Sequence, residues 1–493
     1  MRKAGFPHNK LKRFSLKGIR LMSVRRIGRA KSGSKLVPSV AVESSVLRRA
    51  VDWILNDRMF ADLRKHGNVS WNAKPLIILA VFLAWMNCDQ LTRAFEKASE
   101  LSSRLYGELA VRTFQGLVRA LVTYSSQLLP MVWARLQSLM ETVSPEHYRI
   151  GKWLTLAVDG SRFTTPRTKS NEHAFAARNF GKGKDARSRC NWKNKRKRTK
   201  KLGVPVKPQI WLTLIWHMGL KLPWCWQTGP STSSERHQFL GLLDSGNFPK
   251  NTLFCADAGF VGYALWAKII EQGQAFLVRV GGNVRLLKNL GHICRGEGIV
   301  CLWPTASARR GDQPIVLRLI EVKGERESMF LVTNVLSESA LSTATLKRIY
   351  PLRWGVELQF RAMKQTFGRG KLRSRNAQHA LIELDWSLVA LTMVQLLAIK
   401  EQLKLNIPPD KTSVARALRA IRDAIDNWNE SSGTSPCLTR ELRAAIKDAY
   451  NRTKPKAARY HPDYKDKPSA TRPKVQPATR LQRKAYQALM TSA

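Results

Sequence analysis

The stretch that decides how this chain is organised is residues 349–368, which read IYPLRWGVELQFRAMKQTFG. Polar side chains recur there at steps of three or four residues, the spacing that places side chains on one face of a helix. They are Tyr350, Arg353, Glu357, Arg361 and Lys364. One carboxylate among three cations and a phenol suits a site that grips phosphate beside a metal ion. A solvated helix with i,i+4 ion pairs is the alternative for this stretch taken alone.

Two aspartates upstream each follow a short apolar segment. Residues 153–158 (WLTLAV) predict a buried strand that closes in a turn at Asp159, and residues 252–256 (TLFCA) predict another that ends at Asp257. Between them we expect a hairpin and a helix, at residues 209–218, 224–228 and 234–243. An aspartate after a strand is often only turn chemistry. The pair, in this element order and upstream of Glu357, favours a shared site for divalent cations, because Mg²⁺ prefers carboxylate oxygens.

With these residues in place, the chain resembles the DDE transposases of insertion-sequence family four, the group that includes the Tn-five cut-and-paste transposase. The resemblance rests on the spacing Y-x2-R-x3-E-x6-K and covers about residues 151–368. It implies that Asp159, Asp257 and Glu357 are the catalytic, metal-binding acids for two Mg²⁺ ions roughly 4 Å apart, which Mn²⁺ can replace.

The resemblance also implies contacts to double-stranded DNA, at the inverted-repeat ends of a transposon and at the target. Tyr350, Arg353 and Lys364 would contact phosphates, and Arg361 on the same stripe would join them. Such enzymes have an aromatic pocket for a flipped base during hairpin formation, and Trp303 is the candidate here. A core role for this tryptophan is the alternative. A homodimer in the DNA complex is a further implication.

The expected fold is α/β, with a ribonuclease-H-like catalytic core, a β-rich insertion, a helical N-terminal domain, and a helical and basic C-terminal region. Residues 1–40 form a basic arm, and residues 41–150 a helical DNA-binding domain. The core occupies residues 151–273 and 329–404 on either side of an insertion at 274–328, and the C-terminal region spans 405–493. Within that last region, residues 452–483 are rich in proline and lysine, and we expect a flexible tail.

The charge of the chain indicates a polyanionic partner. Its 493 residues carry 84 Lys plus Arg against 35 Asp plus Glu, a net charge of +49, which favours nucleic acid. Two basic segments stand out, the N-terminal arm and residues 182–201. No membrane anchor is predicted, because the longest apolar run, residues 76–86, is too short to span a bilayer. Scattered cysteines and the DNA partner favour the bacterial cytoplasm, at the nucleoid.

Two other functions remain open at this point. The first is a ribonuclease-H-like DNA nuclease without strand transfer, and the second is a domesticated DNA-binding protein that has lost catalysis. The helical signature and the β-rich insertion disfavour the first. The presence of all three acids disfavours the second. Short inverted repeats bounded by direct repeats beside the gene would favour a mobile element.

Overall fold

A computed structural model describes residues 40–107, 110–176, 207–291, 297–323, 328–426, 437–448 and 472–491, with side chains from Val46 onward. The basic segment at residues 182–201 lies outside these ranges, and so does the basic arm up to residue 39.

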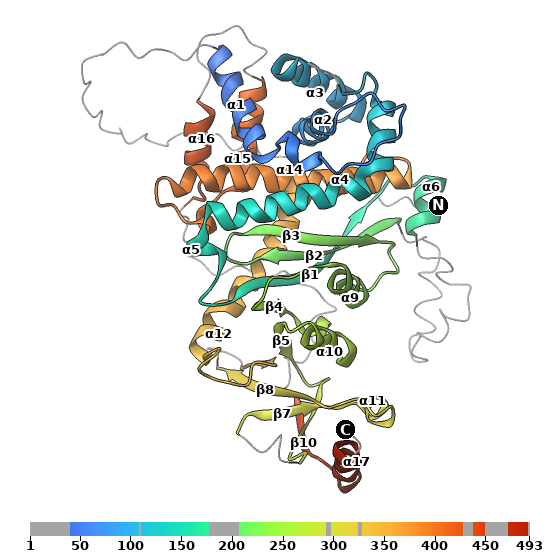
Figure 1. Ribbon diagram of the computed structural model, residues 1–493, viewed down its shortest axis with the longest axis vertical. Helices are drawn as coiled ribbons and strands as arrows, with labels where there is room; N and C mark the ends of the chain where they lie inside the picture. Colours follow the sequence, from blue (N-terminus) through green and yellow to red (C-terminus); the bar gives the residue numbers. More distant parts are fainter. Residues whose placement is uncertain are drawn as a thin grey trace, which may run out of the picture. The chain divides into compact units, whose positions relative to one another are not determined.

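A ten-stranded mixed sheet organises the described part of the chain, in the order β10-β6-β7-β8-β9-β5-β4-β1-β2-β3 (Figure 1). Its five strands at the β3 end are β1 (Leu154–Thr164), β2 (Gln209–His217), β3 (Leu222–Gly229), β4 (Thr252–Ala256) and β5 (Ala275–Val280). The first three pair antiparallel, whereas β4 lies parallel to both β1 and β5. The expected hairpin and the strand before Asp257 are therefore present.

The strands that we expected to form an insertion continue the same sheet. They are β6 (Arg285–Lys288), β7 (Ile299–Leu302) and β8 (Ile315–Val322). The neighbour of β8 is β9 (Met329–Thr333), which we expected to be the last strand of the core. Strand β9 pairs antiparallel with β5, which joins these strands to the parallel pair. The sequence pattern placed β5 with the insertion, but its hydrogen bonds to β4 make it a neighbour of the site-bearing strands.

Seven of the described helices cover one side of the β1–β3 region. They are α1 (Val40–Ile54), α2 (Ala73–Trp85), α3 (Leu91–Tyr106), α4 (Phe114–Val143), α14 (Ala377–Leu403), α15 (Val414–Asp426) and α16 (Leu438–Ala444). Figure 1 shows α14, in orange, alongside α4 and between α2 and the sheet. It is long and apolar enough to cross a membrane, yet 83% of its most apolar window is buried inside the protein. An apolar helix with that burial is a core helix.

The remaining elements are short. The helices are α5 (Pro145–Tyr148), α6 (Lys169–Phe175), α9 (Glu235–Ser245), α10 (Tyr263–Glu271), α11 (Thr305–Arg309), α12 (Thr343–Ile349), α13 (Gly355–Arg361) and α17 (Arg480–Thr491). Single 3₁₀ turns occur at Asp57–Phe60, Ala258–Phe260, Tyr350–Trp354 and Pro409–Lys411, and a π-turn spans Ala362–Thr366.

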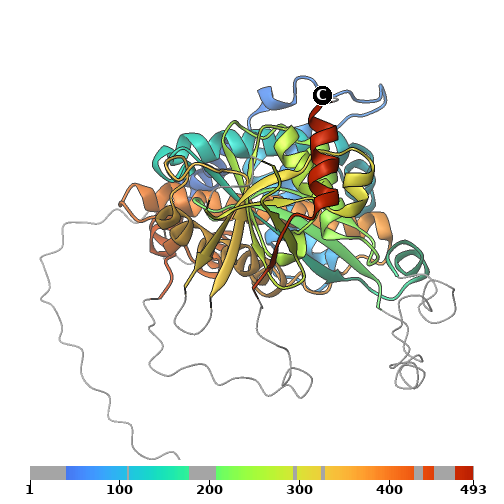
Figure 2. The ribbon, with the colours of Figure 1, turned by 90° about the horizontal axis from the view of Figure 1, so that it is seen from below.

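Residues 472–483 correct part of the expectation of a flexible tail, whose residues 452–471 lie outside the described ranges. Residues Lys474–Pro477 form β10, which pairs in parallel with β6, and α17 follows. Figure 2 shows α17, in red, beside the yellow strands. Tyr486 of α17 is buried against Leu290 and Trp303. A proline- and lysine-rich composition hides this pairing because few of the described side chains there are apolar, and the packing rests on Val475, Ala478 and Tyr486.

Candidate active site

Asp159 lies on β1, and Asp257 lies directly after the neighbouring strand β4. In the parallel pair β1–β4, Ala157 is level with Cys255, and two more residues along each chain lead to the two aspartates. Strand β1 does not close at Asp159 as predicted. It runs on to Thr164, and Asp159 stands opposite Leu214 of β2 in mid-strand, where hydrogen bonds to β2 override the local turn signal. The Asp257 carboxylate instead caps a 3₁₀ turn by accepting from the Gly259 amide at 2.8 Å.

Glu357 reaches this edge of the sheet from α13. The helix approaches closely because Gly355 packs on the Trp216 ring of β2, where a Cβ atom would lie 2.0 Å from the indole. Trp216 of β2 is opposite Ala157 of β1, and Asp159 is two residues further along β1. Because side chains alternate along a strand, Trp216 and Asp159 point to the same face of the sheet. The contact therefore sets Glu357 over the face to which the Asp159 side chain points.

The Tyr350–Lys364 segment is not one regular stripe. It passes through a 3₁₀ turn, the α-helix α13 and a π-turn, so its helical step changes twice. Tyr350 is buried, and its hydroxyl donates to the Ala256 carbonyl at 3.2 Å, directly before Asp257. In this position the phenol braces the aspartate-bearing strand end instead of facing solvent.

Of the three cationic side chains in the Tyr350–Lys364 segment, two contact residues of the acidic site and one is exposed on the surface. The Arg353 guanidinium lies 3.6 Å from the Glu357 carboxylate, and its side chain is only 13% exposed. Lys364 Nζ donates to the Ser161 hydroxyl at 2.7 Å, two residues beyond Asp159 on the same strand face. Arg361 is exposed. A π-turn is frequently found where a helix carries functional side chains, and Lys364 lies within this one.

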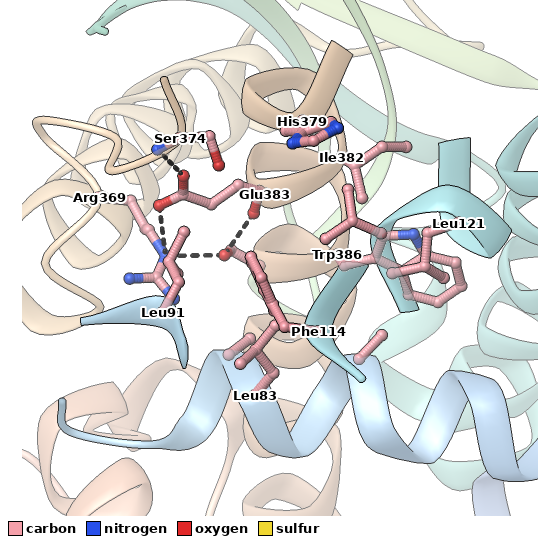
Figure 3. A pocket seen from close by; sticks show the side chains of 14 residues that line it. Leu83, Leu91, Phe114, Leu121, Arg369, Ser374, His379, Ile382, Glu383 and Trp386 are labelled. Carbon is pink, nitrogen blue, oxygen red and sulfur yellow. Dashed lines mark hydrogen bonds and ion pairs between the residues drawn. The ribbon is translucent and has the colours of Figure 1, made fainter. Parts of the chain in front are cut away.

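A buried network fixes the segment that follows the π-turn. The Arg369 Nε donates to the Ser387 hydroxyl at 2.8 Å and lies 3.9 Å from the Glu383 carboxylate. Glu383 also accepts from the amides of Arg373 and Ser374. Figure 3 shows Arg369, Ser374 and Glu383 beside a small pocket lined largely by apolar side chains. They tie the chain to α14, so the π-turn before them is held at both ends.

Mutual repulsion marks the carboxylates as one group. Burial, together with Asp257 and Glu357, raises the pKa of Asp159 to about 6, although the Gly160 amide and Arg353 oppose the shift. The pKa of Glu357 is also raised, mainly by burial and further by Asp257, with Arg353 opposing. A fourth acid, Glu235 at the start of α9, has its pKa raised to about 7 by burial and by both aspartates.

The donor set fits a divalent cation, although the described residues do not hold three donors gathered closely enough to bind one as they stand. Carboxylate oxygens are the ligands of Mg²⁺ and Mn²⁺. Burial is the largest cause of the raised pKa values of Asp159 and Glu357, and repulsion among the acids adds to it. Glu357 is turned to Arg353, so a cation between the aspartates would replace the guanidinium as its partner.

Comparison with known sequences gives this arrangement a family. The family described as "Transposase DDE domain" matches residues 154–393, which contain β1, β4 and α13. The transposase InsG of insertion sequence element IS4 from Escherichia coli K12 is 22% identical over 396 residues, covering 77% of this chain and 83% of that protein. These matches support a DDE transposase, with its DDE domain at residues 154–393 and a likeness to the IS4 transposase over most of the chain.

Two further matches are a putative transposase and a solved structure. The putative transposase y4zB of Sinorhizobium fredii is 26% identical over 175 residues, covering 34% of this chain and 48% of that protein. A solved structure, the piggyBac transposase synaptic complex with hairpin DNA, covers 84% of this chain and 87% of its own, with 10% identity and a TM-score of 0.39. That score is too low to define a shared fold.

Trp303 lies in the core of the transposase, contrary to the expectation of a base-stacking platform. It is 4% exposed, its indole N–H donates to the Asp312 carbonyl at 2.8 Å, and its ring meets Tyr486 edge to face. Such a ring has no free face for a base. The C-terminal helix that covers it is remote in sequence, so the strand pattern around residue 303 gave no sign of this burial.

Sequence reasoning missed two candidate residues, one next to Arg353 in the chain and one beside the acids. Trp354 is 54% exposed and follows Arg353 directly. An aromatic residue among the cations of the signature was a usable signal for it. Glu235 had no such signal, because an acid in the first turn of a helix is common for electrostatic reasons alone. Only the sheet brings it to the aspartates.

Proposed function

We propose that this transposase carries out cut-and-paste transposition of an insertion sequence, by metal-dependent phosphodiester hydrolysis and strand transfer at its inverted-repeat ends. The observation that carries the proposal is the level placement of Asp159 and Asp257 on adjacent parallel strands, with Glu357 brought over the same face. Three converging carboxylates can bind the divalent cations that phosphodiester cleavage uses, in which an attacking oxygen displaces a leaving oxygen at phosphorus.

Asp159, Asp257 and Glu357 are the residues that would hold two Mg²⁺ ions, or Mn²⁺ in their place. When bound, the ions activate the attacking oxygen and stabilise the leaving oxygen of an in-line displacement. The protein contributes position: the Tyr350 hydroxyl braces the strand end before Asp257, and the Gly355–Trp216 contact sets the helix that carries Glu357. Arg353 pairs with Glu357, and a bound cation would compete with the guanidinium for this carboxylate.

The same helix offers groups for DNA. Arg361 is exposed and Lys364 ends beside Ser161, so both cations border the acids and can bind phosphates of the cleaved strand. Trp354 replaces Trp303 as the candidate for stacking on a base, because its ring is exposed. The net charge of +49 supports double-stranded DNA as the partner, both transposon ends and target.

The sheet supports a ribonuclease-H-like core as the finer description of the fold. Its strands β3-β2-β1-β4-β5 comprise an antiparallel trio followed by two parallel strands, with the aspartates on the central β1 and directly after β4. We further infer a homodimer in the DNA complex, since a transposon has two ends to be joined, and a bacterial cytoplasmic location at the nucleoid.

Excision from a plasmid tests this function. The plasmid would carry a marked copy of the element with its own flanking DNA, and the wild-type protein would be compared with Glu357→Gln, which keeps the side-chain size and removes the charge. Glu271→Gln is the matched control, because Glu271 is a largely exposed glutamate at the end of α10. We expect the wild type and the control to excise and Glu357→Gln to bind the ends without excising.

Two results would contradict the proposal. If Glu357→Gln excises as well as the wild type, Glu357 is not the third acid. If the wild type cuts at the ends but never joins them to a target, the protein is a nuclease without strand transfer.

A further inference from the structure

Glu235 approaches the two aspartates from the opposite side of the sheet to Glu357. Side chains alternate across β1, so Asp159 points to the α13 face and Gly160 to the α9 face. The Glu235 carboxylate lies against Gly160, where a Cβ atom would be 2.5 Å from its Cγ and 2.6 Å from its Oε1. The missing side chain at residue 160 therefore leaves the room that this carboxylate occupies.

The same carboxylate also reaches toward Asp257. A Cβ atom on Gly259 would lie 2.9 Å from Asp257 Oδ1 and 3.9 Å from Glu235 Oε2, so the two oxygens border one small space. Two glycines thus flank Glu235, one beside each aspartate. This places its negative charge next to both strand-borne acids and away from the helix that carries Glu357.

No residue in the described ranges gives the Glu235 carboxylate a hydrogen bond or an ion pair. The cation that acts on it most is Arg162, whose guanidinium is 4.3 Å from the centre of the Trp211 ring. A half-buried carboxylate beside two others, with no donor of its own, carries an uncompensated electrostatic cost. A divalent cation between these acids would remove that cost.

We propose that Glu235 is a fourth carboxylate of the divalent-cation site, acting from the α9 side on the cation held by Asp159 and Asp257. The inference rests on the proposed metal-dependent function. The ordinary explanation for an acid at this place is the helix dipole of α9, since Glu235 is in the first turn after Ser234. That explanation requires no approach to Gly160 or Gly259, whereas the cation site requires both.

Binding of Mn²⁺ tests the proposal without any need for DNA cleavage. The affinity would be measured at pH 8 from the electron paramagnetic resonance signal of free Mn²⁺, and thermal unfolding would be followed with EDTA and with Mn²⁺. The variants are Glu235→Gln, Asp257→Asn as the test of the site itself, and Glu146→Gln as control. Glu146 is likewise an acid in the first turn of a helix, but it contacts Ser144 and His147.

We expect Glu235→Gln to bind Mn²⁺ about 10-fold more weakly than the wild type. This is the lower end of the loss in metal affinity that follows mutation of residues around the direct ligands. In EDTA the variant should melt at a higher temperature, because one of the mutually repelling charges is gone. Its gain in melting temperature on adding Mn²⁺ should shrink. Glu146→Gln should match the wild type in Mn²⁺ affinity.

The opposite signs would overturn the inference. If Glu235→Gln melts lower in EDTA and binds Mn²⁺ like the wild type, Glu235 serves the helix dipole only. If Asp257→Asn loses Mn²⁺ affinity while Glu235→Gln does not, the metal site consists of Asp159, Asp257 and Glu357, and Glu235 is not part of it. If Mn²⁺ neither binds nor stabilises the wild type, the metal site and this inference fail together.

Discussion

The guanidinium of Arg353 lies 3.6 Å from the carboxylate of Glu357, one helical turn away, and both side chains are withdrawn from solvent to different degrees, 13% and 35% exposed. Arg353 also lowers the pKa of Asp159, so a single cation of the protein offsets two of the acids. In the metal-free protein the positive charge of Arg353 therefore offsets part of the negative charge of the acids. A bound cation would take over this role and free Arg353 from Glu357.

Arg353→Gln should destabilise the metal-free protein by about 1–2 kcal/mol, because a partly buried carboxylate loses its partner beside like charges. Urea denaturation in EDTA measures the loss. In a Glu357→Gln background the same substitution should cost much less, since the pair is already broken. Equal losses in both backgrounds would mean that the ion pair contributes nothing.

Asp159→Asn should stabilise the metal-free protein at neutral and alkaline pH. The pKa of Asp159 rises from 3.8 to about 6 on folding, so the folded state binds this proton more tightly than the unfolded state. Wild-type stability therefore falls as the pH rises from about 4 to 6 and stays reduced above. Asparagine does not ionise, so the variant avoids the cost of the buried charge. Its gain in the free energy of unfolding should be small at pH 4 and on the order of 1–2 kcal/mol at pH 8, after allowance for solvent screening.

Urea denaturation across this pH range provides the measurement. The matched control is Asp62→Asn, because Asp62 is exposed and lies away from the acids in the N-terminal helical region. A gain in stability at pH 8 no larger than that of the control would mean that the charge of ionised Asp159 does not destabilise the folded protein.

Tyr350→Phe should cost about 1 kcal/mol of stability, the ordinary worth of a buried hydrogen bond, by removing the hydroxyl that donates to the Ala256 carbonyl. Excision should fall by more than this loss explains, because the strand end before Asp257 loses its brace. Tyr486→Phe is the control, since its hydroxyl has no hydrogen bond to any residue that the structure describes. Unchanged excision by Tyr350→Phe would argue against a positioning role.

Gly355→Ala should push α13 away from the sheet, because the new methyl group would meet the Trp216 ring at 2.0 Å. Overpacking of this kind costs about 1–3 kcal/mol. We expect excision to be lost while the variant remains folded by circular dichroism. Pairing it with Trp216→Leu should restore part of the activity by opening space. An active Gly355→Ala single variant would show that Glu357 tolerates displacement.

The two tryptophans should behave in opposite ways. Trp354→Ala removes a side chain that is 54% exposed, so stability should hardly change. Affinity for DNA should fall by about 1–3 kcal/mol, the range for one stacked base. Trp303→Ala should instead cost about 3–5 kcal/mol of stability, as for other buried aromatic residues. Urea denaturation and filter binding would distinguish them, and a Trp354→Ala variant with unchanged DNA affinity would exclude the stacking role.

The sequence by itself determined the order of the strands and helices around the aspartates and the identity of the family. Apolar runs and helical spacing are local patterns, so the hairpin, the strand at residues 252–256 and the helix at α9 could all be read from neighbouring residues. The same holds for the Tyr350–Lys364 signature, whose spacing stands in one continuous segment.

Tertiary structure alone decided the features that depend on contacts between distant segments. Hydrogen bonds to β2 carry β1 past Asp159, pairing with β4 brings β5 to the site-bearing strands, and α17 buries Trp303. The approach of Glu235 to Gly160 joins residues 75 positions apart. Such contacts leave no periodicity in the chain, because their free energy comes from surfaces that meet only after the sheet has formed.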